Sequence, residues 1–167
     1  MSFQWETLVT DRNAADVQHV LDLMVRIQEE GFSALSVSEK SAWDIGLKGT
    51  YNYTDLNRVE AATQELSDLY REIGYSTVIT TRPWVREDVP SASETAWVLA
   101  NIRQLVSIGR VFSTTPSVPT SYDKLSWQKA NDIEQILYDL MIGLGIIKST
   151  TRRSGTFNSG MTETTLI

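Results

Sequence analysis

The stretch Tyr51–Tyr75, YNYTDLNRVEAATQELSDLYREIGY, predicts the helix around which the chain is organised. Thr54 is a suitable N-cap, and Asp55 lies beside it at the positive end of the helix dipole. Apolar residues recur at spacings of three, four and seven, and this stripe comprises Leu56, Val59, Leu66, Leu69 and Ile73. Gly74 follows the stripe at the C′ position, where glycine readily adopts a left-handed backbone. The pattern indicates a helix of about 20 residues.

Four further segments show helical patterns that begin at capping residues, which are Asn13, Ser36, Ser91 and Ser126. Ser36 and Ser91 are each followed three residues later by glutamate, which is the capping-box spacing. All four prolines lie in two linkers and none lies in a helical pattern. The sequence therefore predicts an all-α fold, a small bundle of four to five helices in residues 11–148.

One shared core is predicted from the common helical phase of apolar residues, which are Val59, Leu66, Leu69, Ile102, Leu105, Ile133, Leu137 and Leu140. The sequences around Asn57 and Asn131 are similar, LNRVE and ANDIE. One interpretation is chance together with helix statistics. The other is that both amides are partly buried, bond neighbouring backbone and fix the helix register.

The two ends lie outside the helical patterns, so residues 1–10 and 149–167 are expected to be extended arms. The second is rich in Ser, Thr and Gly and cannot build its own core. We expect such arms to contact partner subunits. The candidate contact residues are Trp5, Trp84, Phe157, Leu166 and Ile167.

Composition excludes several classes of function. The net charge of −6 argues against nucleic acid or an anionic membrane as the main partner. The chain contains no cysteine, so it has neither disulfides nor thiolate metal ligands. The longest apolar run, residues 140–147, is too short to span a bilayer, so no membrane insertion is expected.

No catalytic or metal site is predicted. His19 is the single histidine, and although Asp16 and Asp22 flank it, a solvated polar face explains all three better than a zinc site does. The acidic residues of the Tyr51–Tyr75 helix and of the last helix, Glu134 among them, are expected on solvent-facing sides rather than in a catalytic pair. We therefore expect no enzymatic activity and no cofactor.

Four motifs resemble those of a family of small proteins from prophages and tailed phages of Gram-positive bacteria. They are TDRNAADV at 10–17, Trp43 with LKG at 47–49, YNYTDLNRVE at 51–60 and ANDIEQIL at 130–137. The resemblance covers roughly residues 10 to 145. It departs at Asn13, where the family often has threonine, and either residue caps a helix.

This family is encoded among tail and baseplate genes and has no established catalytic residues. The resemblance implies a virion structural protein, made in the host bacterial cytoplasm and assembled at the tail tip or baseplate with copies of itself and other virion proteins. The alternatives are a cell-wall-directed binding or hydrolytic module of the tail, and a soluble phage assembly chaperone or regulator.

Overall fold

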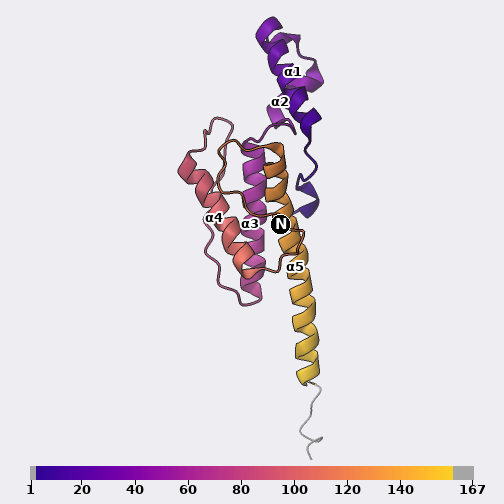
Figure 1. Ribbon diagram of the computed structural model, residues 1–167, viewed down its shortest axis with the longest axis vertical. Helices are drawn as coiled ribbons and strands as arrows, with labels where there is room; N and C mark the ends of the chain where they lie inside the picture. The colour runs from indigo at the N-terminus through magenta and orange to yellow at the C-terminus, as the bar shows by residue number, and fades with distance from the viewer. Residues whose placement is uncertain (1–2, 160–167) are drawn as a thin grey trace, which may run out of the picture.

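The computed structural model describes residues 3–159, which form helices joined by loops, without a strand in that range. Three helices form the body of the molecule: α3 (Tyr53–Glu72), α4 (Ala92–Ile108) and α5 (Trp127–Ser159). Figure 1 shows them side by side, with α5 extending beyond the other two. The all-α class predicted from the sequence is confirmed.

Helix α3 begins two residues earlier than an N-cap at Thr54 would place it. The cap is Asn52, whose side chain accepts a hydrogen bond from the Thr54 N–H at 2.8 Å. Asp55 reaches back to the Asn52 N–H at 2.9 Å and completes a capping box. Asn52 rather than Thr54 is the cap, because its amide oxygen accepts from a free N–H group of the first turn while its own backbone stays extended. Gly74 has φ +93°, as its expected left-handed position requires.

The core lies between α3, α4 and α5. Of the eight residues assigned to it from helical phase, seven are fully buried in one cluster, and Leu69 packs against that cluster while partly exposed. The cluster also takes in Tyr70, Trp84 and Ile136, which the stripe pattern had not included.

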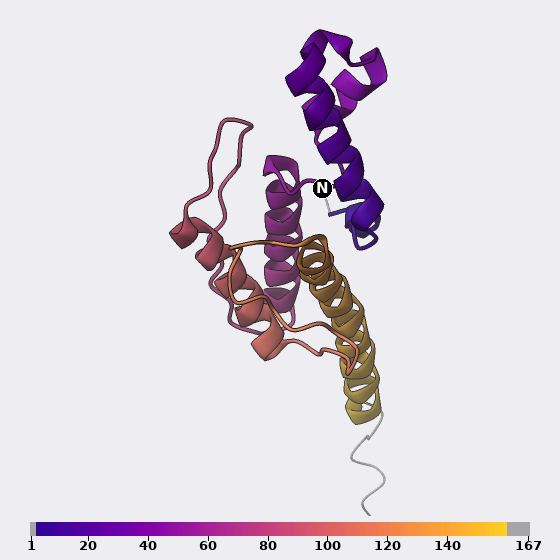
Figure 2. The ribbon, with the colours of Figure 1, turned by 45° about the horizontal axis from the view of Figure 1, so that its top comes forward.

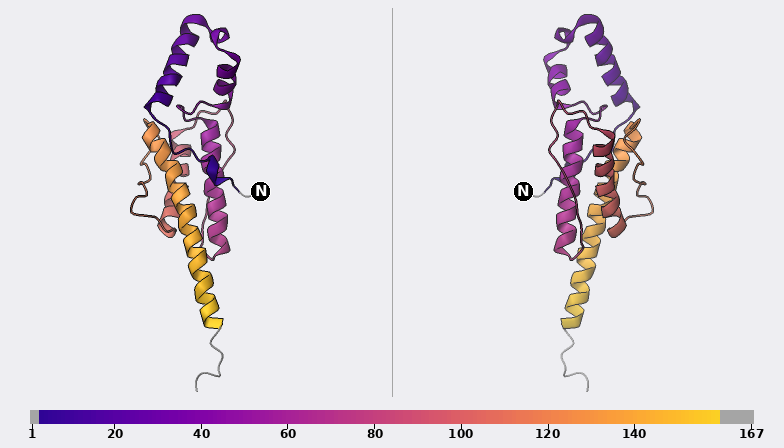
Figure 3. Two further views of the ribbon diagram at one scale, coloured as in Figure 1. Left: turned by 90° about the vertical axis from the view of Figure 1, so that its right-hand side faces the viewer. Right: turned by 90° about the vertical axis from the view of Figure 1, so that its left-hand side faces the viewer.

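A helical hairpin projects from one end of the bundle, and we call residues 14–45 the head (Figures 2 and 3). It consists of α1 (Ala14–Glu30), the short 3-10 helix η2 (Phe32–Ala34) and α2 (Val37–Ile45). The predicted caps at Asn13 and Ser36 are both present as capping boxes, and Gly31 ends α1 with φ +84°. The head buries only Val20, Leu23 and Leu35.

The N-terminal segment is not an open arm. It forms a 3-10 helix, η1 (Trp5–Thr7), and Phe3, Trp5 and Leu8 pack against the bundle core. Phe3 and Trp5 lie edge to face, with ring centroids 4.9 Å apart. Trp5 thus contacts its own chain, because burying these apolar groups offsets the entropy of ordering the segment.

The expectation of extended backbone from residue 149 is corrected as far as Ser159, where α5 ends. Adding residues to an existing helix avoids the cost of nucleation, so a polar composition does not stop it. The hydroxyls of Ser149 and Thr150 both donate to the Ile146 carbonyl at 2.8 Å. Hydroxyl side chains are accommodated in a helix in this way.

A carboxylate in the head gives a pH-dependent prediction. The Arg26 side chain and the Ser36 N–H both donate to Glu39, and these bonds lower its pKa from 4.5 to about 2. Because the pKa of Glu39 is lower in the folded state than in the unfolded state, its contribution to the free energy of unfolding is complete above pH 4.5. This contribution is lost as the pH falls towards 2. An NMR titration of the Glu39 carboxyl group should show a midpoint near 2. Arg26→Gln should raise that midpoint, and a wild-type midpoint near 4.5 would contradict the arrangement.

Candidate functional site

Four charged side chains meet at the junction of head and bundle. We call this group the charge hub, and it consists of Arg12, Asp55, Arg58 and Glu134. One Arg12 nitrogen lies 2.7 Å from both Asp55 Oδ1 and Glu134 Oε1. Arg58 contacts Glu134 at 2.9 Å and also pairs with Asp55. Burial alone would lower the pKa of Arg58, but its bonds to Glu134 and the nearby charges outweigh this and raise it.

The hub fastens the N-terminal segment to the bundle. Glu134 is wholly buried and also accepts the Val9 N–H at 2.6 Å. Asn131, one helical turn earlier, accepts the Arg12 N–H at 3.0 Å and donates to the Arg12 carbonyl at 2.8 Å. One turn of α5 therefore holds backbone from residues 9 to 12 through an amide and a carboxylate.

Asn57 holds a second backbone segment in the same way. Its amide donates to the Trp84 carbonyl and accepts the Trp84 N–H, both at 2.8 Å. Asn57 and Asn131 are partly buried, and each forms hydrogen bonds with the backbone of a neighbouring segment. This agrees with the second interpretation of the similarity between LNRVE and ANDIE, in which both amides bond neighbouring backbone. Each amide fixes a connecting segment against a bundle helix, so the register of that segment is set by a side chain.

The turn between α2 and α3 is fitted closely to the base of α1. Lys48 pairs with Asp11 at 2.8 Å and lies 3.7 Å from Asp16. Gly49 packs against the backbone of Asp16 and Val17, where a Cβ atom would collide with the Asp16 carbonyl. Glycine is needed here for close approach rather than for its φ angle.

Residues of all four motifs thus meet at one junction between head and bundle. The junction is closed, because Arg12, Asp55 and Glu134 are buried and bonded to one another. Both hub carboxylates are paired with arginine side chains. The motif residues hold the fold together and arrange the surfaces around it.

Another buried carboxylate, Glu60, does not belong to the hub. It accepts the Arg82 N–H at 2.8 Å, and the Arg82 guanidinium lies 3.8 Å from the centroid of a Trp84 ring. Burial raises the pKa of Glu60, and this is partly offset by the Arg82 N–H and by the indoles of Trp84 and Trp97. Both indole nitrogens and Glu60 Oε1 are buried, and none of the three has a hydrogen-bond partner among the residues that the structure describes.

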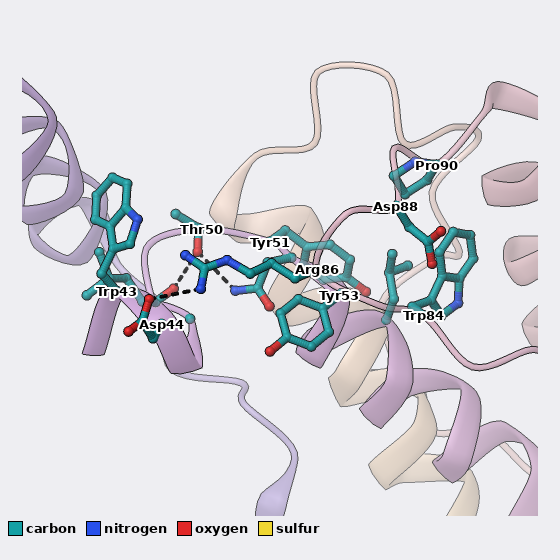
Figure 4. A pocket seen from close by; sticks show the side chains of 13 residues that line it. Trp43, Asp44, Thr50, Tyr51, Tyr53, Trp84, Arg86, Asp88 and Pro90 are labelled. Carbon is teal, nitrogen blue, oxygen red and sulfur yellow. Dashed lines mark hydrogen bonds and ion pairs between the residues drawn. The ribbon is translucent and has the colours of Figure 1, made fainter. Parts of the chain in front are cut away.

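Between α2 and the loop that carries Trp84 lies a cavity of about 300 Å³, which we call the cleft. Trp43 and Asp44 from α2 line one side, and the loop carrying Trp84, Arg86 and Asp88 lines the other (Figure 4). The first turn of α3 supplies the floor, including Tyr53. Arg86 extends across the mouth to Asp44, with a nitrogen–oxygen distance of 2.9 Å.

The structure contradicts the prediction for one contact residue, Trp84, and does not describe the side chains of three others. Trp84 is only 2% exposed and belongs to the core, so its assignment to a partner surface is wrong. Trp84 lies outside the predicted helices, and its position in the sequence does not reveal the Asn57 bonds that hold its loop against α3. The side chain of Phe157 and all of Leu166 and Ile167 lie outside the described residues.

Sequence reasoning missed Arg12, Asp55 and Glu134 as buried groups, although a signal was present. Asp55 precedes Val59 by four residues and Glu134 precedes Leu137 by three, so each carboxylate falls on the apolar side of its helix. A charge in phase with an apolar stripe indicates a buried, paired group rather than a solvent-facing one.

Residues 3–159 hold no group of three or more His, Asp or Glu side chains placed to bind a metal ion. Within the same range, no helix is long and apolar enough to cross a membrane. Comparisons with protein-family models, curated proteins and solved structures find no match to this chain.

Proposed function

We propose that the chain is a structural component of a tailed-phage particle, an assembly or adaptor protein of the tail tip or baseplate. The four motifs that resemble the phage family support this role, since their residues serve the fold of the junction rather than a reaction. The observation that carries the proposal is the head, whose outer side is built for contact with another protein.

One side of α1 is apolar and uncovered. Leu21, Met24 and Val25 are 48%, 52% and 51% exposed, and their spacing places them together on the helix. Leu21 and Val25 lie away from Val20 and Leu23, which pack inward, whereas Met24, four residues after Val20, borders that inward side. Exposed apolar side chains gathered on one face are typical of protein–protein contact sites.

The charge of the head indicates what kind of surface it meets. Residues 14–45 contain six acidic and two basic side chains, so the head carries a large share of the net charge of −6. Two heads placed face to face would repel each other. The matching surface is therefore an apolar patch edged with lysine or arginine on a neighbouring virion subunit.

The test is incorporation into particles. Leu21→Asp with Val25→Asp should leave the circular dichroism spectrum unchanged, because both side chains are half exposed, yet remove the chain from purified virions. The matched control is Ala15→Asp with His19→Asp, an equally spaced pair of exposed positions on another side of α1, which should incorporate normally. The proposal fails if the wild-type chain is absent from purified particles. That result would favour the assembly chaperone or regulator.

A further inference from the structure

The cleft has unpaired hydrogen-bonding groups beside exposed ring surface. The Trp43 indole N–H and the Tyr53 hydroxyl make no hydrogen bond with any residue that the structure describes, and both side chains are half-buried in the cleft lining. Figure 4 shows Trp43 on the α2 side and Tyr53 on the α3 side, with Arg86 between them. Neither group is used by the charge hub.

We propose that the cleft binds a neutral saccharide, a mono- or disaccharide unit held between Trp43 and Tyr53. The cavity of about 300 Å³ lies at the lower end of the range for small-molecule sites, which suits a ligand of this size. Sites of this kind combine mostly apolar walls with a few polar groups that orient the ligand, and the lining of the cleft has both.

Charge in the lining argues against an ionic ligand. Asp44 is paired with Arg86, and Asp88 lies 3.5 Å from Arg82 and accepts the Val85 N–H. An anion would meet the two carboxylates, and a cation would meet Arg86 at the mouth. A purely apolar ligand would bury the Trp43 and Tyr53 polar groups without partners, which is costly.

A sugar satisfies these requirements together. Its C–H faces pack on aromatic rings, while its hydroxyls both donate and accept hydrogen bonds. The Tyr53 hydroxyl, the Trp43 N–H and the Asp44 carboxylate supply matching groups around the cavity.

The mouth of the cleft can open at little cost. The Arg86 and Asp44 side chains are each about half exposed, and ion pairs of this kind contribute little to stability because water screens both charges. Arg86 can therefore exchange its bond to Asp44 for bonds to sugar hydroxyls. The ion pair is a replaceable contact at the entrance rather than a fixed wall.

The experiment is a titration of the purified full chain, followed by two-dimensional ¹H–¹⁵N NMR of the tryptophan indole signals. The probes are N-acetylglucosamine and methyl glucoside, with inorganic phosphate and choline as charged comparisons. A neutral sugar should shift the Trp43 indole signal in a saturable way, while the Trp127 signal stays in place. Phosphate and choline should leave the Trp43 signal unchanged.

Tyr53→Phe removes only a hydroxyl and should weaken sugar binding about 3- to 10-fold, the ordinary range for one hydrogen bond. The matched control is Tyr138→Phe, at an exposed tyrosine on α5 outside the cleft, which should bind as the wild type does. The proposal is overturned if neither sugar moves the Trp43 signal, if a charged probe binds more tightly, or if Tyr53→Phe binds normally. Because the titration uses the isolated chain, its outcome is independent of whether the chain enters virions.

Discussion

Replacing Glu134 with glutamine is expected to lower the free energy of unfolding by about 3–5 kcal/mol, the usual cost of breaking a buried ion pair from one side. Glutamine has nearly the same shape, so the change removes charge rather than volume. Arg12 and Arg58 would then share Asp55 as their remaining carboxylate in the hub. Two guanidinium groups with one counter-charge in a buried site are strongly unfavourable.

The measurement is urea unfolding of both proteins, followed by circular dichroism. The matched control is Asp68→Asn, which also neutralises a carboxylate paired with an arginine, Arg71, on α3. That pair is about half exposed, so its loss should cost no more than about 1 kcal/mol. Equal effects of the two changes would show that the hub contributes no more than a surface pair does.

Local features of the fold could be predicted from the sequence because their physics is local. The capping boxes at Ser36 and Ser91 depend on residues three apart, and the structure has both. The apolar stripe of α3 depends on helical spacing alone, and it faces the core at Val59 and Leu66. Such patterns require no knowledge of which segments meet.

The charge hub and the cleft could not be predicted in this way, because they join segments far apart in the chain. Arg12 and Glu134 are 122 residues apart, and nothing near either residue names the other. The cleft needs the α2–α3 turn and the Trp84 loop to lie opposite each other. The Asn57 bonds to Trp84 hold that loop in place, and they become visible only when the helices are packed.

The position of the charge hub accounts for the arrangement of head and bundle. Arg12 immediately precedes the cap of α1, and Asp55 is in the first turn of α3, so the hub lies where the chain enters and leaves the head. Lys48 and Gly49 add contacts on the same side. A head fixed at its base by buried charges can present its apolar side in one orientation, which the proposed adaptor role would require.

Truncating Leu66 to alanine is expected to lower the free energy of unfolding by about 2–5 kcal/mol, since a buried leucine loses both its transfer free energy and its packing. Leu66 is 0% exposed and lies in the cluster shared by α3, α4 and α5, so the surrounding side chains can relax only partly into the space. The matched control is Leu21→Ala on α1, where the leucine is half exposed and should cost well under the Leu66 value. Urea unfolding measures both. A loss of a few tenths of a kcal/mol for Leu66→Ala, similar to that for Leu21→Ala, would show that α3 does not form the centre of the core.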